Sequence, residues 1–423
     1  MKIFFDTVGC RLNQAEIEHL ASEFRSSGHT IIDTAEGADL VVVNTCSVTA
    51  AAASDSRQKV RQAQHAGASN ILVTGCLATL EPSEIARLPG VKRVVSNQAK
   101  PQIAGLVMGQ LADFDLEPLA RQPLPGARKR TRAFIKVQDG CNNHCTFCVT
   151  RIARGEARSI PRDEVLREVN HALHGGSREV VLTGVHLGWW GRDLRHEETL
   201  PDLVGYLLEK TTIERLRLSS TEPWDLDDRF FDLWQDPRMC RHLHLPLQSG
   251  SAEVLKRMAR RTSLVEYAQL LAHARERIPG LAVTTDIIVG FPGETEDEFS
   301  ESLEFVRSMN FAGGHVFRYS ARPGTAAARL SGRVHGTIAR ERGRLMRLAL
   351  EKSARHYADG QVGCELKTLW EAAEPQDGGW LVRGLTDNYL PVTAQAGSDR
   401  SNEIDWVRID GYKKGSLCAT ITG

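Results

Sequence analysis

The sequence lacks any apolar run of the length that a membrane-spanning helix requires. Such a helix needs roughly 20 consecutive apolar residues, and no stretch of the 423-residue chain reaches that length. The start, MKIFFDTVGCRLNQ, pairs one basic residue with a very short apolar stretch, which is unlike a signal peptide. We therefore expect a soluble, cytoplasmic protein without a membrane partner.

The chain also lacks net charge, a repeat of fixed period and low-complexity tracts. Its 53 basic residues balance 53 acidic ones, so overall electrostatics give no reason to assume a nucleic-acid partner, and only local clusters could. The apolar fraction of 41% is sufficient for a substantial core. A chain of this length is expected to form two or three domains.

What the chain does have is nine cysteines, at positions 10, 46, 76, 141, 145, 148, 240, 364 and 418. In a reducing cytosol such a set indicates metal ligation or catalysis more often than disulfides. Spacing separates a dispersed triad (Cys10, Cys46 and Cys76) from a compact triad (Cys141, Cys145 and Cys148). The other three are isolated, and we expect them to be buried thiols.

The dispersed triad falls in a region that alternates between strand-like and helix-like patterns. Apolar runs at KIFFDTV, DLVVVNT and NILVTG are separated by helical patterns near 14–27 and 51–66, which predicts an open parallel α/β sheet. Each cysteine directly follows one apolar run. Because the carboxyl ends of parallel strands share one edge, the three thiols are expected to converge; the alternative is three small buried residues at strand ends.

A second α/β series follows a basic, proline-containing linker at 121–132. Its six strand candidates are AFIKVQ, EVVLTGV, RLRLSS, HLHLPLQ, AVTTDIIVGF and HVFRYS. With helical patterns at 161–174, 251–278 and 295–309, they predict a partial (β/α)6 barrel whose active face lies at the strand C-termini. A helix is expected over 333–357, with seven basic residues, and a small β-barrel or sandwich after it.

The compact triad, in GCNNHCTFCVT, has the spacing C-x3-C-x2-C and directly follows the first strand of the second series. Three thiolates this close can bind three irons of a cubane cluster and leave the fourth open. An open iron can chelate S-adenosylmethionine and pass one electron to its sulfonium, which yields methionine and a 5′-deoxyadenosyl radical. The alternative is a structural zinc site, which normally needs four ligands; His144 would be a cramped fourth.

This spacing, with Phe147 before the last cysteine, resembles the signature of the radical S-adenosylmethionine superfamily. The resemblance implies that Phe147 lies near the adenine and that Gly175 and Gly176 lie near the cofactor's amino group. Candidates for ribose and methionine contacts follow or lie in predicted strands: Glu222, Gln248 and Asp286. Core packing is the alternative for Phe147, a helix C-cap for the glycine pair, and caps or turns for the others.

The two triads together resemble the radical-SAM methylthiotransferase family over essentially the whole chain. The matching segments are GCRLNQAE, NTCSVT, TGCLA, CNNHCTFCVTRIARGEARS, LPLQSGS and DIIVGFPGET. The resemblance implies an N-terminal methylthiotransferase domain (1–120), a central radical-SAM barrel with a trailing helix (127–356) and a C-terminal TRAM-like β domain (357–423). It also implies two 4Fe–4S clusters, the dispersed triad holding an auxiliary cluster that binds the sulfur to be methylated and inserted.

The branches of this family modify isopentenyl-adenosine in tRNA, a ribosomal-protein aspartate, or threonylcarbamoyl-adenosine next to the anticodon. GCRLNQAE, the short length and TDNYLPV (386–392) are most similar to the third branch. One departure is Arg151 and Ile152 after the compact triad, where bacterial members often have a Pro–aromatic pair. We therefore expect methylthio addition to carbon 2 of N6-threonylcarbamoyl-adenosine, with S-adenosylmethionine as methyl donor and radical source.

The resemblance implies the tRNA anticodon stem-loop and a reductant such as flavodoxin or ferredoxin as partners, and we expect a monomer. The linker and the 333–357 helix are basic, as phosphate contacts require. The last domain has six basic and ten acidic residues, so tRNA contact there would need a local patch of Arg383, Lys413 and Lys414 with Tyr389. The alternatives are a radical enzyme acting on a protein and a non-catalytic iron–sulfur RNA-binding sensor.

Overall fold

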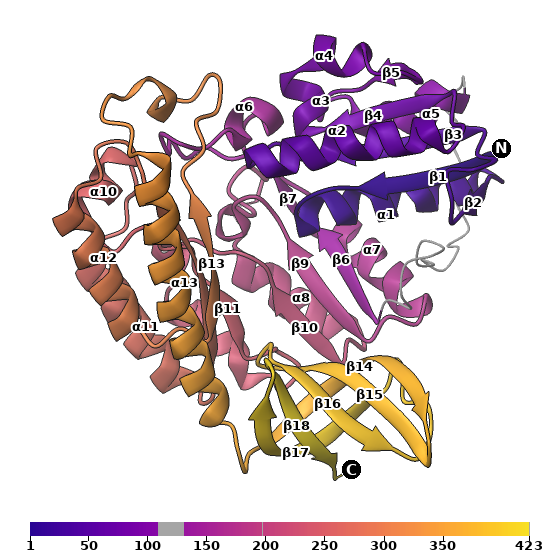
Figure 1. Cartoon of the computed structure of the whole chain (residues 1–423). Coiled ribbons are helices and arrows are strands. Elements are labelled where there is room, and N and C mark those ends of the chain that lie inside the picture. The colour runs from indigo at the N-terminus through magenta and orange to yellow at the C-terminus, as the bar shows by residue number, and fades with distance from the viewer. Residues whose placement is uncertain (109–130, 197, 423) are drawn as a thin grey trace. The chain divides into compact units, whose positions relative to one another are not determined.

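The computed structural model describes residues 1–108, 131–196 and 198–422 (Figure 1). The chain divides into two compact units. The first comprises Met1–Asn143, Cys148–Ser177 and Thr183–Val185; the second comprises His144–Phe147, Arg178–Leu182 and His186–Gly423. The three-domain division expected from the sequence stays a prediction. The linker up to residue 130 lies outside the described residues, and no described helix is long and apolar enough to cross a bilayer.

The first unit is built on a parallel sheet with the strand order β2-β1-β3-β4-β5. Its elements are β1 (Lys2–Thr7), α1 (Arg11–Ser26), β2 (Thr30–Ile32), β3 (Leu40–Thr45), α2 (Ala50–His65), β4 (Ile71–Gly75), α3 (Cys76–Leu80), α4 (Pro82–Ala86), β5 (Val91–Val94), a 3-10 turn (Lys100–Gln102) and α5 (Ile103–Met108). β3 and β4 are buried throughout, as central strands covered on both faces must be. The open parallel α/β sheet predicted from the sequence is confirmed.

Helices cover both faces of this sheet. Residues of α1 and α5 pack with Ile3, Phe5 and Val42 in one core, while residues of α2, α3 and α4 pack with Val41 and Val43 in another. Side chains of consecutive residues in a strand point to opposite faces, which is why Val41 and Val42 belong to different cores. The result is a doubly wound layer with one edge at the carboxyl ends of its strands.

The first unit continues with β6 (Arg132–Lys136), β7 (Gln138–Asp139), α6 (Thr150–Arg154), β8 (Arg158–Ser159) and α7 (Arg162–His174). β7 and β8 pair antiparallel, Gln138 with Ser159 and Asp139 with Arg158. The chain between them contains the cysteine loop 140–149 and then the short helix α6.

The second unit carries the later strands of the α/β series. Its elements up to the last long helix are β9 (Glu179–Thr183), α8 (Leu200–Lys210), β10 (Arg215–Leu218), α9 (Asp228–Asp232), β11 (His242–His244), α10 (Ala252–Arg257), α11 (Leu264–Arg277), β12 (Ala282–Val289), α12 (Glu296–Ser308), β13 (Gly313–Arg318) and α13 (Gly336–Asp359), with 3-10 turns at Leu187–Trp189, Pro223–Asp225, Leu233–Gln235 and Ala327–Arg329. β9 and β10 are parallel, as are β11, β12 and β13, and single bridges link β10 to β11. Every strand expected in this series is present.

One helix expected from the sequence is wrong in its extent. The pattern over 251–278 predicts a single helix, but α10 ends at Arg257 and α11 begins at Leu264. Ala259 adopts φ of 53°, a left-handed conformation that a continuing helix cannot contain. Ser263 then caps α11 through its hydroxyl. The break carries Arg260, whose role is described below.

The C-terminal residues form a closed barrel with the order β14-β15-β16-β18-β17 (yellow in Figure 1). Its strands are β14 (Glu365–Gln376), β15 (Gly379–Thr386), β16 (Pro391–Ala396), β17 (Ile404–Lys413) and β18 (Ser416–Ile421). Trp370, Val382 and Leu417 lie in its core. Closure removes exposed strand edges and confirms the predicted small β-barrel. Of the three isolated cysteines expected to be buried, Cys364 is exposed because it lies in the short segment between α13 and β14, and Cys418 in β18 is only partly buried.

Candidate functional site

The dispersed triad lies at the ends of neighbouring strands, as predicted. A Cβ atom added at Gly9 would lie 2.6 Å from Cys46 Cβ and 2.8 Å from Cys46 Sγ, so Cys46 packs directly against the residue before Cys10. One added at Gly75 would lie 2.3 Å from the carbonyl oxygen of Thr45, the residue before Cys46. Both glycines have positive φ, 108° and 100°. Only glycine allows this approach, and the three cysteines are thereby brought to one edge.

The surroundings of the triad suit a cluster with one open side. Cys46 and Cys76 are buried, whereas Cys10 is exposed. Burial, followed by the neighbouring Cys10 and Cys76, raises the pKa of the Cys46 thiol to about 11. Iron binding would therefore displace a proton at neutral pH. No group of three or more His, Cys, Asp or Glu in the described ranges converges on a single metal ion; in a cubane each cysteine binds a different iron, which sets the sulfurs farther apart.

A buried charge network lies beside the triad, and sequence reasoning did not find it. Arg154 donates to Asn13 Oδ1 at 2.7 Å, to Glu16 Oε1 at 2.8 Å and to Asp139 Oδ1 at 3.0 Å. Lys100 donates to Glu16 as well. Burial raises the pKa of Glu16, but Lys100 and Arg154 outweigh it and hold this pKa well below its ordinary value. Lys136 also lies 3.3 Å from Glu16. The network therefore contains three cations, Lys100, Lys136 and Arg154, and two carboxylates, Glu16 and Asp139.

This network gives a structural role to the polar residues of the motif GCRLNQAE. Cys10 is the N-cap of α1, and Asn13 and Glu16 follow at intervals of three residues on the same face of that helix. Asn13 also donates to the carbonyls of Val8 and Thr45, which join the ends of β1 and β3. The excess positive charge suits a cluster with three thiolate ligands, since such a cluster is an anion. The residues present therefore fit an iron–sulfur cluster at this edge.

Of the compact triad, Cys141 and Cys148 lie in the first unit, and Cys145 lies in the second. Backbone N–H groups of Asn143 and Thr150 point at the sulfurs of Cys141 and Cys148, each at 3.4 Å. Such hydrogen bonds stabilise thiolates, so these sulfurs fit a cluster as well.

In the second unit, Arg260 joins Cys145 to one of the predicted cofactor residues. Its guanidinium binds both carboxylate oxygens of Glu222, at 2.9 and 2.7 Å, and lies 3.9 Å from Cys145 Sγ. The guanidinium also covers the ring of Trp224 at 4.7 Å. Arg260 therefore connects Glu222 with Cys145, one of the predicted cluster ligands. The break between α10 and α11 positions Arg260, and nothing in the sequence pattern indicated it.

The other two predicted polar contacts lie next to each other. Gln248 has φ of 72° and its backbone bonds to Asp286 and Ile288, which places it beside β12. Asp286 Oδ2 lies 3.3 Å from His244 Nε2, while its buried Oδ1 has no hydrogen-bond partner among the described residues. A buried carboxylate oxygen without a partner is costly, and a ligand hydroxyl would satisfy it. The pair therefore fits a ribose contact.

Three predicted positions have structural roles. Phe147 packs against the core formed by Val254, Met258, Phe291 and Ala327, which is the alternative that the sequence left open. Gly175 is the C-cap of α7, and Gly176 has φ of 86° and donates to the carbonyl of Leu173. The glycine pair precedes β9 and so marks the N-terminal end of that strand. The helix-cap reading accounts for both glycines.

The basic helix α13 is present but begins at Gly336 rather than at residue 333, and five of its expected basic residues are exposed: Arg340, Arg344, Arg347, Lys352 and Arg355. Arg342 is the exception: it is buried, donates to the Glu294 carboxylate at 2.8 Å and pairs with Glu296. It is therefore unavailable to phosphate. Tyr389 is likewise occupied by contacts within the protein. Its ring stacks on that of His242, with the ring centroids 4.3 Å apart, and the Arg217 guanidinium lies over the Tyr389 ring.

The motif TDNYLPV has a packing role in the second unit. Arg215 and Arg217 are fully buried, and their guanidinium groups donate to the carbonyls of Thr386, the last residue of β15, and Asp387, in the turn that follows. Glu179 neutralises both, at 2.8 and 2.7 Å from their Nε atoms. The turn therefore attaches the C-terminal barrel to the N-terminal ends of β10 and β11.

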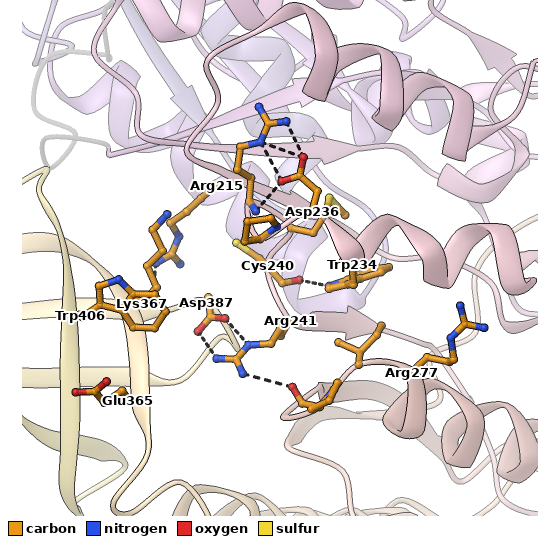
Figure 2. Close-up of a pocket in the computed structure, with 15 residues that line it drawn as sticks. Arg215, Trp234, Asp236, Cys240, Arg241, Arg277, Glu365, Lys367, Asp387 and Trp406 are labelled. Carbon is orange, nitrogen blue, oxygen red and sulfur yellow. Dashed lines mark hydrogen bonds and ion pairs between the residues drawn. The ribbon is translucent and has the colours of Figure 1, made fainter.

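A pocket of about 400 Å³ adjoins this attachment, lined by residues that include Arg215, Arg238, Arg241, Lys367 and Trp406 (Figure 2). Figure 2 shows Arg241 facing Asp387, with which it forms an ion pair. Arg238 is paired with Asp236 in the same way. The pocket lies at the N-terminal ends of the strands, whereas ligands of such α/β barrels bind at the C-terminal ends. It is therefore not the candidate active site.

Comparison with known proteins identifies two family matches that span these regions of the chain. Residues 135–306 match the Radical SAM superfamily and residues 2–96 match Uncharacterized protein family UPF0004. The threonylcarbamoyladenosine tRNA methylthiotransferase MtaB of Bacillus subtilis is 35% identical over 96% of this chain and 93% of its own. The proteins of the same name from Aquifex aeolicus and Thermotoga maritima are each 33% identical, over 93% and 91% of this chain and 96% and 88% of their own.

Solved structures share the fold at low identity. The radical S-adenosylmethionine methyltransferase TsrM of Kitasatospora setae has a TM-score of 0.56 at 14% identity, covering 75% of this chain and 72% of that one. The radical enzyme OxsB has a TM-score of 0.51 at 12% identity, covering 83% of this chain and 56% of that one. Membership of the superfamily implies S-adenosylmethionine and a 4Fe–4S cluster. By its cysteine motifs, its domain matches and its full-length relatives, the chain belongs to the radical-SAM methylthiotransferase family, alongside the MtaB proteins.

Proposed function

We propose that this protein adds a methylthio group to carbon 2 of N6-threonylcarbamoyl-adenosine, next to the anticodon of tRNA. The observation that carries the proposal is the convergence of Cys10, Cys46 and Cys76 at one sheet edge, in a chain that also has the compact triad. One triad suffices to generate a radical; a second is needed to bring sulfur. The names of the relatives support the threonylcarbamoyl-adenosine branch over isopentenyl-adenosine or a ribosomal protein.

The target atom explains why two clusters are needed. Carbon 2 of adenine has neither an acidic proton nor a leaving group, so acid–base catalysis cannot functionalise it. When bound, the cluster of Cys141, Cys145 and Cys148 would supply the electron that cleaves S-adenosylmethionine, and the auxiliary cluster would supply the sulfur. Arg260 would hold Glu222 against the cofactor, and Gln248 and Asp286 would bind its ribose and methionine.

The reductant and the oligomeric state belong to the same proposal. A low-potential one-electron donor, such as flavodoxin or ferredoxin, would reduce the compact-triad cluster, and the enzyme would act as a monomer. In cells, deletion of the gene should remove 2-methylthio-N6-threonylcarbamoyl-adenosine from tRNA and leave N6-threonylcarbamoyl-adenosine in its place. Mass spectrometry of tRNA nucleosides tests this, and an unchanged nucleoside profile would refute the substrate.

Binding of tRNA should depend on the exposed face of α13. Reversing the charge of Arg347, Lys352 and Arg355 to Glu should raise the Michaelis constant for tRNA, because phosphate contacts are lost. It should also reduce the log–log salt dependence of binding by about 1 for each contact. The matched control reverses Lys210, an exposed lysine at the end of α8. Equal salt dependence in the variant and the parent would rule out this face as the tRNA-binding surface.

A further inference from the structure

Asn97 is a buried amide next to a proposed cluster ligand, and neither the motifs nor the proposed function assigns it a role. It is 6% exposed and follows β5. Its backbone N–H donates to Thr79 Oγ1 at 2.8 Å, and that hydroxyl donates to the carbonyl of Gly75 at 2.9 Å. Asn97 is therefore fixed to α3, the helix that begins at Cys76.

The side-chain amide of Asn97 has two hydrogens, and each has an acceptor. Nδ2 lies 2.9 Å from the carbonyl oxygen of Ala153 and 3.6 Å from Cys76 Sγ. Because a backbone carbonyl can only accept, the bond to Ala153 places the nitrogen rather than the oxygen toward Cys76. The orientation of the amide is thus determined by its protein neighbours and does not depend on the cluster.

This geometry is compatible with Cys76 as a thiolate ligand. A thiolate accepts hydrogen bonds, so the N–H···S contact would strengthen on deprotonation. The contact between Cys10 Sγ and Asn13 Oδ1, at 3.9 Å, behaves oppositely, since it needs the thiol proton. Of these two side-chain contacts, only the one from Asn97 can act on a bound cluster.

We propose that Asn97 raises the reduction potential of the auxiliary cluster by donating a hydrogen bond to the thiolate of Cys76. Hydrogen bonds to cluster sulfurs withdraw electron density and stabilise the more negative, reduced state. One reductant serves two clusters, so their relative potentials decide which cluster holds the electron. The second hydrogen of the amide keeps it in position through Ala153 in α6, the helix that follows Cys148. Asn97 is accordingly a positioning and tuning residue, and this inference rests on the proposed auxiliary cluster.

The test isolates the auxiliary cluster in the full chain. With Cys141, Cys145 and Cys148 replaced by Ala, the protein is reconstituted anaerobically, and its one-electron reduction by dithionite is followed by electron paramagnetic resonance against potential. Adding Asn97→Ala should shift the midpoint to a more negative value. Asn97→Asp, which keeps the shape but lacks the N–H donor and adds a negative charge, should shift it further. Asn70→Ala is the control, because that exposed amide donates to the carbonyl of Asp39.

The outcomes distinguish a failure of the proposed auxiliary cluster from a failure of the role of Asn97. If the background variant with all of Cys10, Cys46 and Cys76 present holds no iron, the auxiliary cluster itself is refuted. If it holds a cluster whose midpoint is unchanged by both Asn97 substitutions, only the role of Asn97 is refuted. The isosteric Asp variant keeps the test decisive should the Ala variant lose its cluster.

Discussion

A variant with Cys10, Cys46 and Cys76 all changed to Ala is expected to form no methylthio product, yet to cleave S-adenosylmethionine on reduction. The parent should hold about eight irons after anaerobic reconstitution and the variant about four, because each triad suits one cubane cluster. The loss of product should be complete, since no other described residue of the sheet edge can replace three thiolates. Iron and sulfide assays, cofactor cleavage and product analysis give three independent readouts.

The control for this variant is Cys364→Ala, which removes one exposed thiol outside both triads and should change none of the three readouts. The reverse variant, with Cys141, Cys145 and Cys148 changed to Ala, should also retain about four irons but lose cofactor cleavage. Methylthio product from the dispersed-triad variant, or a parent that never exceeds about four irons, would contradict the two-cluster account.

The second large effect concerns stability. Glu179→Ala should lower the free energy of unfolding by about 3–5 kcal/mol, because it leaves two buried guanidinium groups without a counter-charge. Glu179 is fully buried between Arg215 and Arg217. A loss of this size is a large share of the stability of an ordinary domain. Urea unfolding under anaerobic conditions, monitored by circular dichroism, measures it.

Glu214→Ala is the matched control for the stability measurement. Glu214 is exposed and pairs with the exposed Arg178, and such surface pairs contribute about 0–1 kcal/mol. Both variants replace a glutamate of the second unit by alanine, one buried and one exposed. If Glu179→Ala unfolds at the same urea concentration as Glu214→Ala, Glu179 does not stabilise the buried Arg215 and Arg217 in the way described.

The elements that could be predicted from the sequence are those with a local signal. Strands β3 and β4 are continuous apolar runs, and glycine precedes Cys10 and Cys76 at the points where the backbone comes closest to its neighbours. The convergence of the dispersed triad could be predicted because the carboxyl ends of parallel strands lie at one edge of the sheet. The buried-charge network did not, because Glu16 and Arg154 are 138 residues apart, and no local pattern indicates which charges will be buried together.

Other differences have equally specific causes. The residues 251–278 have helical periodicity throughout, yet Ala259 breaks the helix and presents Arg260 to Cys145 and Glu222. Arg342 appears in a basic stretch, but its position on the inner face of α13 directs it to Glu294. TDNYLPV served as a marker of the branch, and the structure shows what its turn does: it binds two buried arginines.

The proposed activity can be reconstituted from the purified, cluster-loaded protein, tRNA that carries N6-threonylcarbamoyl-adenosine, reductant and S-adenosylmethionine. Our prediction is that nucleoside mass spectrometry finds the 2-methylthio derivative of this nucleoside, and none when the dispersed triad is replaced by Ala. Modification of isopentenyl-adenosine instead, or of a ribosomal protein alone, would contradict it.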